Sequence, residues 1–211
     1  MKKLKKLIIA CDGESASGKS TAAKLISKKY NLTLVNSGLL YRYASKLSIK
    51  HKPKNLVSFL KKKFDKISYQ KIAKEKLHSE KISIHTAHLA KKKAIREIIN
   101  KFQKNIIRKN KRICVEGRDI ATKILNKNPR YDLAFYFTCR ISIASKRRWK
   151  ELKKKAPLKE IQKSLAKRTK MDKNRKYSPL KKVKDAIHIS TDRLSKKEVL
   201  RRMSNEVDKI I

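Results

Sequence analysis

The residues most able to carry chemistry form one short segment near the start of the chain: Gly13-Glu14-Ser15-Ala16-Ser17-Gly18-Lys19-Ser20-Thr21. The first eight match G-x-x-x-x-G-K-[ST], a loop whose backbone N–H groups surround phosphate oxygens. An apolar run precedes the segment, and a stretch with helical periodicity follows it to Tyr30. In such a strand–loop–helix unit, Lys19 reaches the β- and γ-phosphates and the Ser20 hydroxyl is a ligand of Mg²⁺. We therefore predict that residues 13–21 bind a nucleoside triphosphate.

Arginines recur just beyond strand-like runs, where ligands of a parallel sheet bind. Arg42 follows the second such run and Arg118 follows the third. Arg168 and Arg175 lie seven residues apart in a helical stretch with Asp172 between them, so the three share one face. Guanidinium groups bind phosphate oxygens bidentately. Several of them in a crevice that already holds a nucleotide predict a second phosphorylated ligand, as in a nucleoside monophosphate kinase.

A GTPase is disfavoured, because guanine recognition would require an N-K-x-D segment after a strand. The nearest string, at 126–129, lacks the Asp and follows no predicted strand. The chemistry expected is therefore phosphoryl transfer between two small ligands.

Strand-like and helical segments alternate along the chain, which favours an α/β fold. We expect a parallel sheet of five strands flanked by helices, with ligands beyond the carboxyl ends of the strands. Ser37 is the expected cap of the second helix, and Ser195 with Glu198 has the spacing of a capping box. Residues 67–84 show no single periodicity. The strands are expected at 4–11, 32–35, 113–116, 132–139 and 186–189, and the helices at 18–30, 37–49, 55–63, 87–108, 141–155, 157–174 and 195–211.

The composition is strongly basic, with 60 Lys and Arg against 17 Asp and Glu in 211 residues, a formal charge of +43. One interpretation is nucleic-acid binding. The other is that Lys has replaced other surface residues throughout the chain. The even spread of Lys and the low aromatic content of 6% favour the second interpretation. Non-specific adhesion to polyanions at low salt is still expected.

Cysteine usage and hydrophobicity indicate a cytoplasmic protein that does not enter membranes. Cys11, Cys114 and Cys139 are widely spaced within apolar runs, which is typical of reduced core residues. The apolar run before the loop is too short for a signal peptide, and no run approaches membrane-spanning length. We expect a monomer.

Five segments, in order along nearly the whole chain, resemble the bacterial cytidylate kinase family. The resemblance implies a single P-loop kinase domain with a core at about 1–49, 88–155 and 181–211. It also implies a small nucleoside-monophosphate-binding insertion at about 50–87 and a helical lid at about 156–180. ATP would be the phosphoryl donor, CMP or dCMP the acceptor, and Mg²⁺ the metal. The segments are Asp12–Thr21, Ser37–Arg42, Glu116–Thr122, Arg168–Leu180 and Asp185–Ser195.

The resemblance also implies a set of residues around CMP and the transferring phosphoryl group. Asp119 and Asp172 would accept hydrogen bonds from ribose hydroxyls or the cytosine amino group, and Arg96 would hold the base. Because a phosphate acceptor is already ionised at pH 7, no general base is expected, and none of the five His residues is assigned one. The substrate-binding set is Ser15, Arg42, Arg96, Arg118, Asp119, Arg168, Asp172 and Arg175, and the catalytic set is Lys19, Arg118, Arg168 and Arg175.

Three positions depart from the family pattern. Glu14 stands where the family has Pro, which puts a carboxylate beside bound phosphates. Ala87 stands where the family has a Ser that contacts cytosine, with Thr86 as a candidate replacement, and Met171 stands where an additional Arg is expected. Asp12, beside the loop, has two interpretations: it holds a Mg²⁺-bound water, or it fixes loop amides.

Two further hypotheses compete with a CMP kinase. One is another small-molecule P-loop kinase, acting on UMP or on a non-nucleotide. The other is an RNA-associated binding protein whose phosphate-binding loop is no longer active, although the intact Gly18-Lys19-Ser20 argues against it.

Overall fold

The computed structural model describes residues 5–211, and they form two compact units. The first unit combines residues up to Leu34 with Lys111–Ile211, and the second is Val35–Asn110. The functional division expected from the sequence, with an insertion at 50–87 and a lid at 156–180, remains a prediction.

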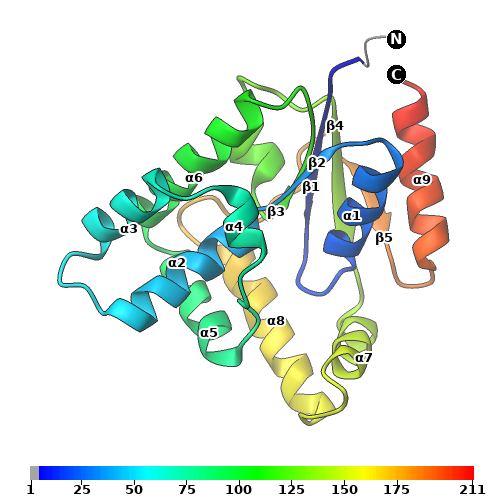
Figure 1. Ribbon diagram of the computed structural model, residues 1–211. Helices are drawn as coiled ribbons and strands as arrows, with labels where there is room; N and C mark the ends of the chain where they lie inside the picture. The colour runs from blue at the N-terminus through cyan, green and yellow to red at the C-terminus, as the bar shows by residue number, and fades with distance from the viewer. Residues whose placement is uncertain (1–4) are drawn as a thin grey trace. The chain divides into compact units, whose positions relative to one another are not determined.

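A five-stranded parallel sheet organises the structure, as predicted (Figure 1). The strand order is β2-β3-β1-β4-β5, with β1 in the centre. Every residue of β1 is buried, as expected for a parallel strand with both neighbours in place. The strands are β1 (Leu7–Gly13), β2 (Thr33–Asn36), β3 (Arg112–Gly117), β4 (Leu133–Thr138) and β5 (Ile187–Ser190).

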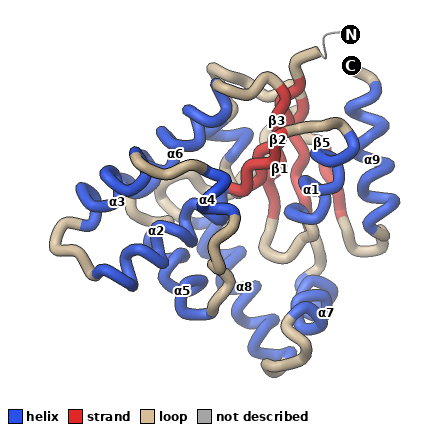
Figure 2. Tube along the Cα trace, in the orientation of Figure 1, coloured by secondary structure: helices blue, strands red, loops and turns tan. Residues whose placement is uncertain are grey.

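Helices α1 and α9 of the first unit lie side by side against the sheet (Figures 1 and 2). Their apolar faces supply Ile26 and Met203 to a core that also contains Phe135 and Phe137 of β4, all of them buried. The helical elements of this unit are α1 (Lys19–Lys29), a single π-helical turn η1 (Ile120–Ile124), α7 (Ile141–Glu151), α8 (Leu158–Asn174) and α9 (Lys196–Asp208). No pattern in the sequence predicted η1.

The second unit packs five helices around its own apolar core, and residues 67–84 contain α4 and the first half of α5 with a connecting segment between them. The predicted helix at 87–108 is wrong at its start, because the helical conformation is interrupted between α5 and α6. Leu89 and Ile95 are both buried, yet six residues on a straight helix would place them about 120° apart. The break lets both side chains enter the core. The helices are α2 (Ser37–His51), α3 (Leu56–Asp65), α4 (Tyr69–Ala73), α5 (Glu80–Leu89) and α6 (Lys93–Arg108).

The observed helix caps agree with those predicted from the sequence, with one exception. The capping box of Ser195 and Glu198 is present at the start of α9, as predicted. The cap of α2 is Asn36 rather than Ser37, because the Asn36 side chain accepts a hydrogen bond from the Leu39 N–H at 3.2 Å. An Asn amide oxygen reaches the exposed N–H groups of the first turn as well as a Ser hydroxyl does.

The three cysteines are buried free thiols, as predicted. Within residues 5–211, no helix is both long and apolar enough to cross a bilayer.

Candidate active site

The phosphate-binding loop turns between β1 and α1, and both of its fixed glycines meet a backbone requirement. A Cβ on Gly13 would lie 2.3 Å from the carbonyl oxygen of Phe137 on β4, so only glycine allows this approach. Gly18 has a φ of 79°, in the left-handed region, directly before the first residue of α1. The loop therefore ends at a helix N-terminus, where N–H groups attract anions.

Lys19 and Ser20 share one carboxylate partner, Glu116 at the end of β3. The Lys19 Nζ lies 2.6 Å from one oxygen of Glu116, and the Ser20 hydroxyl donates to the other at 2.9 Å. Strand pairing sets Cys11 opposite Glu116, which brings the carboxylate to the loop. Burial lowers the pKa of Lys19, while Glu116 opposes that shift. Glu116 thus holds both phosphate-binding side chains, a role that the sequence did not reveal.

Asp12 is buried at the end of β1 and fixes backbone amides. Its two carboxylate oxygens accept hydrogen bonds from the N–H groups of Ile120 (2.9 Å) and Ala121 (2.8 Å). Burial raises the pKa of Asp12 to about 6, although the two N–H groups act in the opposite direction. The amides that Asp12 holds belong to η1 rather than to the phosphate-binding loop.

A cluster of guanidinium and carboxylate groups joins α8 to the end of β3. The Nε of Arg118 donates to Asp172 at 2.9 Å, and its Nη2 lies 3.5 Å from the Ser15 hydroxyl. Arg175 contacts Asp172 at 3.4 Å and Asp119 at 3.6 Å, with its side chain only 6% exposed. The structure thus brings five predicted substrate ligands together beside the phosphate-binding loop.

The other predicted arginines lie on α8 and in the second unit. Arg168 lies one helical turn before Asp172, with a half-buried side chain. In the second unit, Arg42 donates to the carbonyl of Leu77 and to the Ser83 hydroxyl, both at 3.0 Å. The guanidinium of Arg96 lies 5.4 Å from the ring centre of Tyr41, while its Nη1 donates to the Ala90 carbonyl.

Thr86, the candidate replacement for the missing cytosine contact, has internal partners. Its hydroxyl donates to the Ile82 carbonyl at 2.7 Å and lies 2.9 Å from the Ser45 hydroxyl. Its side chain is buried within the second unit. These contacts give no support to Thr86 as a ligand of the base.

A cavity of about 410 Å³ opens beyond β4 and β5 in the first unit. Thr191 connects this cavity to the phosphate-binding loop, because its hydroxyl donates to the Ser17 carbonyl at 3.0 Å. Arg147 of α7 in turn donates to the Thr191 hydroxyl at 3.0 Å and to its carbonyl at 2.6 Å. The cavity is large enough for part of a nucleotide. Its lining residues are Arg140, Ser190, Asp192, Arg193, Leu194 and Arg202.

Comparison with known proteins identifies the family. A model of the cytidylate kinase family, described as "Cytidylate kinase", matches residues 9–209. The chain belongs to the cytidylate kinase family. The cytidylate kinase of Aquifex aeolicus is 36% identical over 96% of this chain and 95% of its own length. That of Clostridium tetani is 32% identical over 98% of this chain and 96% of its own length.

Solved structures support the fold of this cytidylate kinase family member. An uncharacterized protein from Eubacterium ventriosum has a TM-score of 0.55 at 19% identity, covering 96% of this chain and 99% of its own. The shikimate kinase of Bacteroides thetaiotaomicron has a TM-score of 0.50 at 12% identity, covering 96% of this chain and 98% of its own. At these identities, the similarity establishes the P-loop kinase fold.

A metal ion at this site would need oxygen ligands from the substrate phosphates in addition to those of the protein. Residues 5–211 contain no cluster of three or more His, Cys, Asp and Glu side chains suited to a metal ion. Mg²⁺ commonly binds through one or two protein oxygens together with phosphates and water. Ser20 and Glu116 provide such oxygens, 2.9 Å apart and beside the loop. The donor set therefore fits Mg²⁺ bound together with a triphosphate.

The cavity residues were missed from the sequence, although a signal was present. Arg140 follows β4 by two residues, and Asp192–Leu194 follow β5. The rule that ligands bind beyond the carboxyl ends of parallel strands applies to both places. Only the neighbouring positions of β4 and β5 in the sheet show that the two segments face one cavity.

Proposed function

We propose that this member of the cytidylate kinase family transfers the γ-phosphoryl group of ATP to CMP or dCMP, giving ADP and CDP or dCDP. One observation carries the assignment: an arginine–aspartate cluster lies beside an intact phosphate-binding loop in the same unit. The loop suits the donor phosphates. The cluster offers guanidinium groups for a second phosphate and carboxylates for hydroxyl or amino groups.

The donor nucleotide would extend from the loop into the cavity beyond β4 and β5. Thr191 touches the loop and borders the cavity residues in sequence, so the triphosphate and the nucleoside would lie on its two sides. The acceptor would use the arginine–aspartate cluster of the first unit. In the second unit, Arg42 and Arg96 are the side chains that we propose as acceptor ligands. The segments at 50–87 and 156–180 would act as the acceptor-binding insertion and the lid.

Transfer would proceed through positioning and electrostatics. The acceptor phosphate is ionised at pH 7, so no side chain has to remove a proton. Lys19, Arg118, Arg168 and Arg175 would neutralise charge on the equatorial oxygens of the transition state. Ser20, with Glu116 nearby, would hold Mg²⁺, which would supply positive charge beside the β- and γ-phosphates. Closing of the lid would exclude water, which otherwise hydrolyses ATP.

Asp119 and Asp172 have arginine partners in the structure. Asp172 contacts both Arg118 and Arg175, and Asp119 contacts Arg175. Acceptor binding would exchange some of these contacts for contacts to phosphate and ribose. The cluster would thus hold charged side chains in place without leaving them unpaired in a partly dry site.

An ADP-release assay with CMP, dCMP, UMP, AMP and shikimate as acceptors tests the assignment. CMP and dCMP should give the highest turnover, and Lys19→Ala should abolish it. Absence of turnover with every pyrimidine monophosphate would overturn the proposal. Preference for UMP would indicate a related kinase. Salt-sensitive RNA binding without phosphoryl transfer would indicate an RNA-associated binding protein whose phosphate-binding loop is no longer active. We also propose that the enzyme works as a monomer in the cytoplasm.

A further inference from the structure

The phosphate-binding loop makes an ion pair with α8 through the residue that departs from the family pattern. The Nζ of Lys173 lies 2.6 Å from a carboxylate oxygen of Glu14. Glu14 is 17% exposed and Lys173 is 46% exposed, so the pair lies at the rim of the site. In the segment Gly13–Ser20, Glu14 is the one acidic residue.

The backbone fixes Glu14 close to the phosphate position. Its N–H donates to the Phe137 carbonyl at 3.0 Å, and its carbonyl accepts from the Ser17 hydroxyl at 3.0 Å. The side chain therefore leaves the loop from a fixed point, one residue after Gly13. A carboxylate held there repels the phosphates of a nucleotide unless a cation offsets its charge.

Lys173 is well placed to offset that charge because α8 is anchored at the adjacent residue. Asp172 contacts Arg118 at 2.9 Å, so the turn of α8 that carries Lys173 is held at the site. The Lys173 ammonium is charged at neutral pH, and its hydrogen bond to Glu14 raises its pKa further. Arg118 and Lys19 are engaged by other carboxylates, Asp172 and Glu116.

We propose that Lys173 is a positioning residue for the donor nucleotide, which it serves by neutralising Glu14 of the phosphate-binding loop. Lys173 acts through Glu14 and does not itself bind the phosphates. Only the identity of the donor, ATP, rests on the proposed function. The effect belongs to donor binding and is independent of the acceptor.

A double-mutant cycle on ATP affinity, measured by calorimetry without acceptor, tests the proposal. Lys173→Ala should weaken ATP binding about fivefold, the upper range for a partly exposed charge pair. Glu14→Ala should bind ATP at least as well as the natural chain, and Glu14→Ala with Lys173→Ala should match Glu14→Ala within about twofold. Lys170→Ala, an exposed lysine one turn earlier on α8, is the matched control and should change little.

Charge exchange and salt give two further readouts. Glu14→Lys with Lys173→Glu restores the pair in reverse and should bind ATP more tightly than Lys173→Glu alone. The deficit of Lys173→Ala should shrink in 0.5 M salt, where the charges are screened. Unchanged affinity in Lys173→Ala would overturn the proposal, and so would a double variant as weak as Lys173→Ala. Because acceptor is absent, failure of CMP phosphorylation would leave this result unaffected.

Discussion

The ammonium of Lys19 lies 2.6 Å from a carboxylate oxygen of Glu116, and both side chains are about 95% buried. A buried charge without a partner is strongly destabilising, whereas replacing both members of a pair costs far less. Glu116→Gln should therefore lower the free energy of unfolding by about 3 kcal/mol. Lys19→Met with Glu116→Gln should recover most of that loss while remaining inactive. Urea unfolding followed by circular dichroism measures both, and a Glu116→Gln variant as stable as the natural chain would contradict the pairing.

Burial of Asp12 makes stability depend on pH. Its pKa rises from 3.8 in the unfolded chain to about 6 in the folded one, so between these values the folded state binds more protons. The contribution of this group to stability is complete below pH 3.8 and is lost as the pH rises through 6. From pH 4 to pH 7 the loss is about 2 kcal/mol.

Asp12→Ala isolates this contribution. The variant loses the two N–H contacts and should be less stable throughout, but the fall attributed to Asp12 should be missing from its profile. Urea unfolding of both proteins at pH 4, 5, 6 and 7 makes the comparison. Parallel profiles would show that Asp12 does not titrate in this range.

Thr191 should control donor affinity, because its hydroxyl joins Arg147 to the loop carbonyl of Ser17. Thr191→Val keeps the shape but leaves both partners without that contact, and a buried unsatisfied group costs about 1–3 kcal/mol. KM for ATP should rise about tenfold if part of that cost falls on the loop. Thr138→Val, which removes a hydroxyl contact to His188, is the control. Equal KM values in the two variants would rule out the connection.

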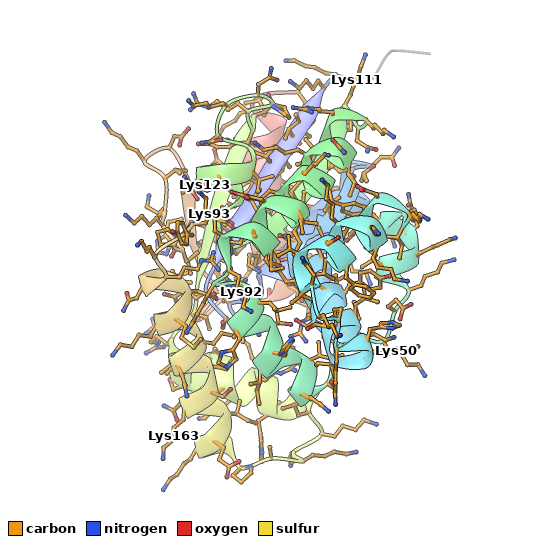
Figure 3. The ribbon with its side chains drawn as sticks, turned by 90° about the vertical axis from the view of Figure 1, so that its left-hand side faces the viewer. Lys50, Lys92, Lys93, Lys111, Lys123 and Lys163 are labelled. Carbon is orange, nitrogen blue, oxygen red and sulfur yellow. The ribbon has the colours of Figure 1, made fainter. Side chains whose placement is uncertain are left out.

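Arg168 of α8 and Arg175, the residue directly after this helix, should matter for turnover. Arg168→Ala or Arg175→Ala should lower kcat about 10²-fold or more, the scale of contacts made in a transition state. Lys163→Ala on the same helix should leave kcat unchanged, because Lys163 is exposed and its side chain projects outward (Figure 3). Steady-state kinetics with CMP measures the effect. Unchanged turnover in both arginine variants would remove the lid from the mechanism.

The basic surface should produce adhesion to polyanions that salt abolishes. Lysine side chains project outward from both units, including Lys50, Lys111 and Lys123 (Figure 3). Binding to heparin or RNA should fall steeply as the logarithm of salt concentration rises, without sequence preference. Filter binding to two unrelated RNAs at 50 and 200 mM salt tests this. Strong preference for one RNA would instead favour specific nucleic-acid recognition.

Local patterns were sufficient to predict the sheet, the loop and the arginine cluster. The motif from Gly13 to Ser20 fixes its own geometry, and the spacing of Arg168 and Asp172 places both on one face of α8. The expected shared face does not extend to Arg175, because the helix ends at Asn174 and Arg175 has an extended backbone. The break before Lys93 was missed because helical periodicity continues through it, while burial of both Leu89 and Ile95 depends on packing. Short-range pattern cannot report such a change of direction.

Contacts between segments far apart along the chain could not be predicted from the sequence. The partners of Lys19 and Glu14 lie 97 and 159 residues away along the chain. Glu14 by itself predicts weaker phosphate binding, and only the position of Lys173 shows how that charge is offset. The cavity beyond β4 and β5 likewise depends on which strands are neighbours.

The central place of β1 in the sheet has a consequence for synthesis of the chain. Its two neighbours, β3 and β4, begin only at Arg112 and Leu133. A growing polypeptide therefore carries a largely apolar strand with both edges open until more than half of the protein has been made. Such a segment is a natural target for chaperones and for aggregation, so expression at low temperature or with added chaperones should raise the yield of folded enzyme.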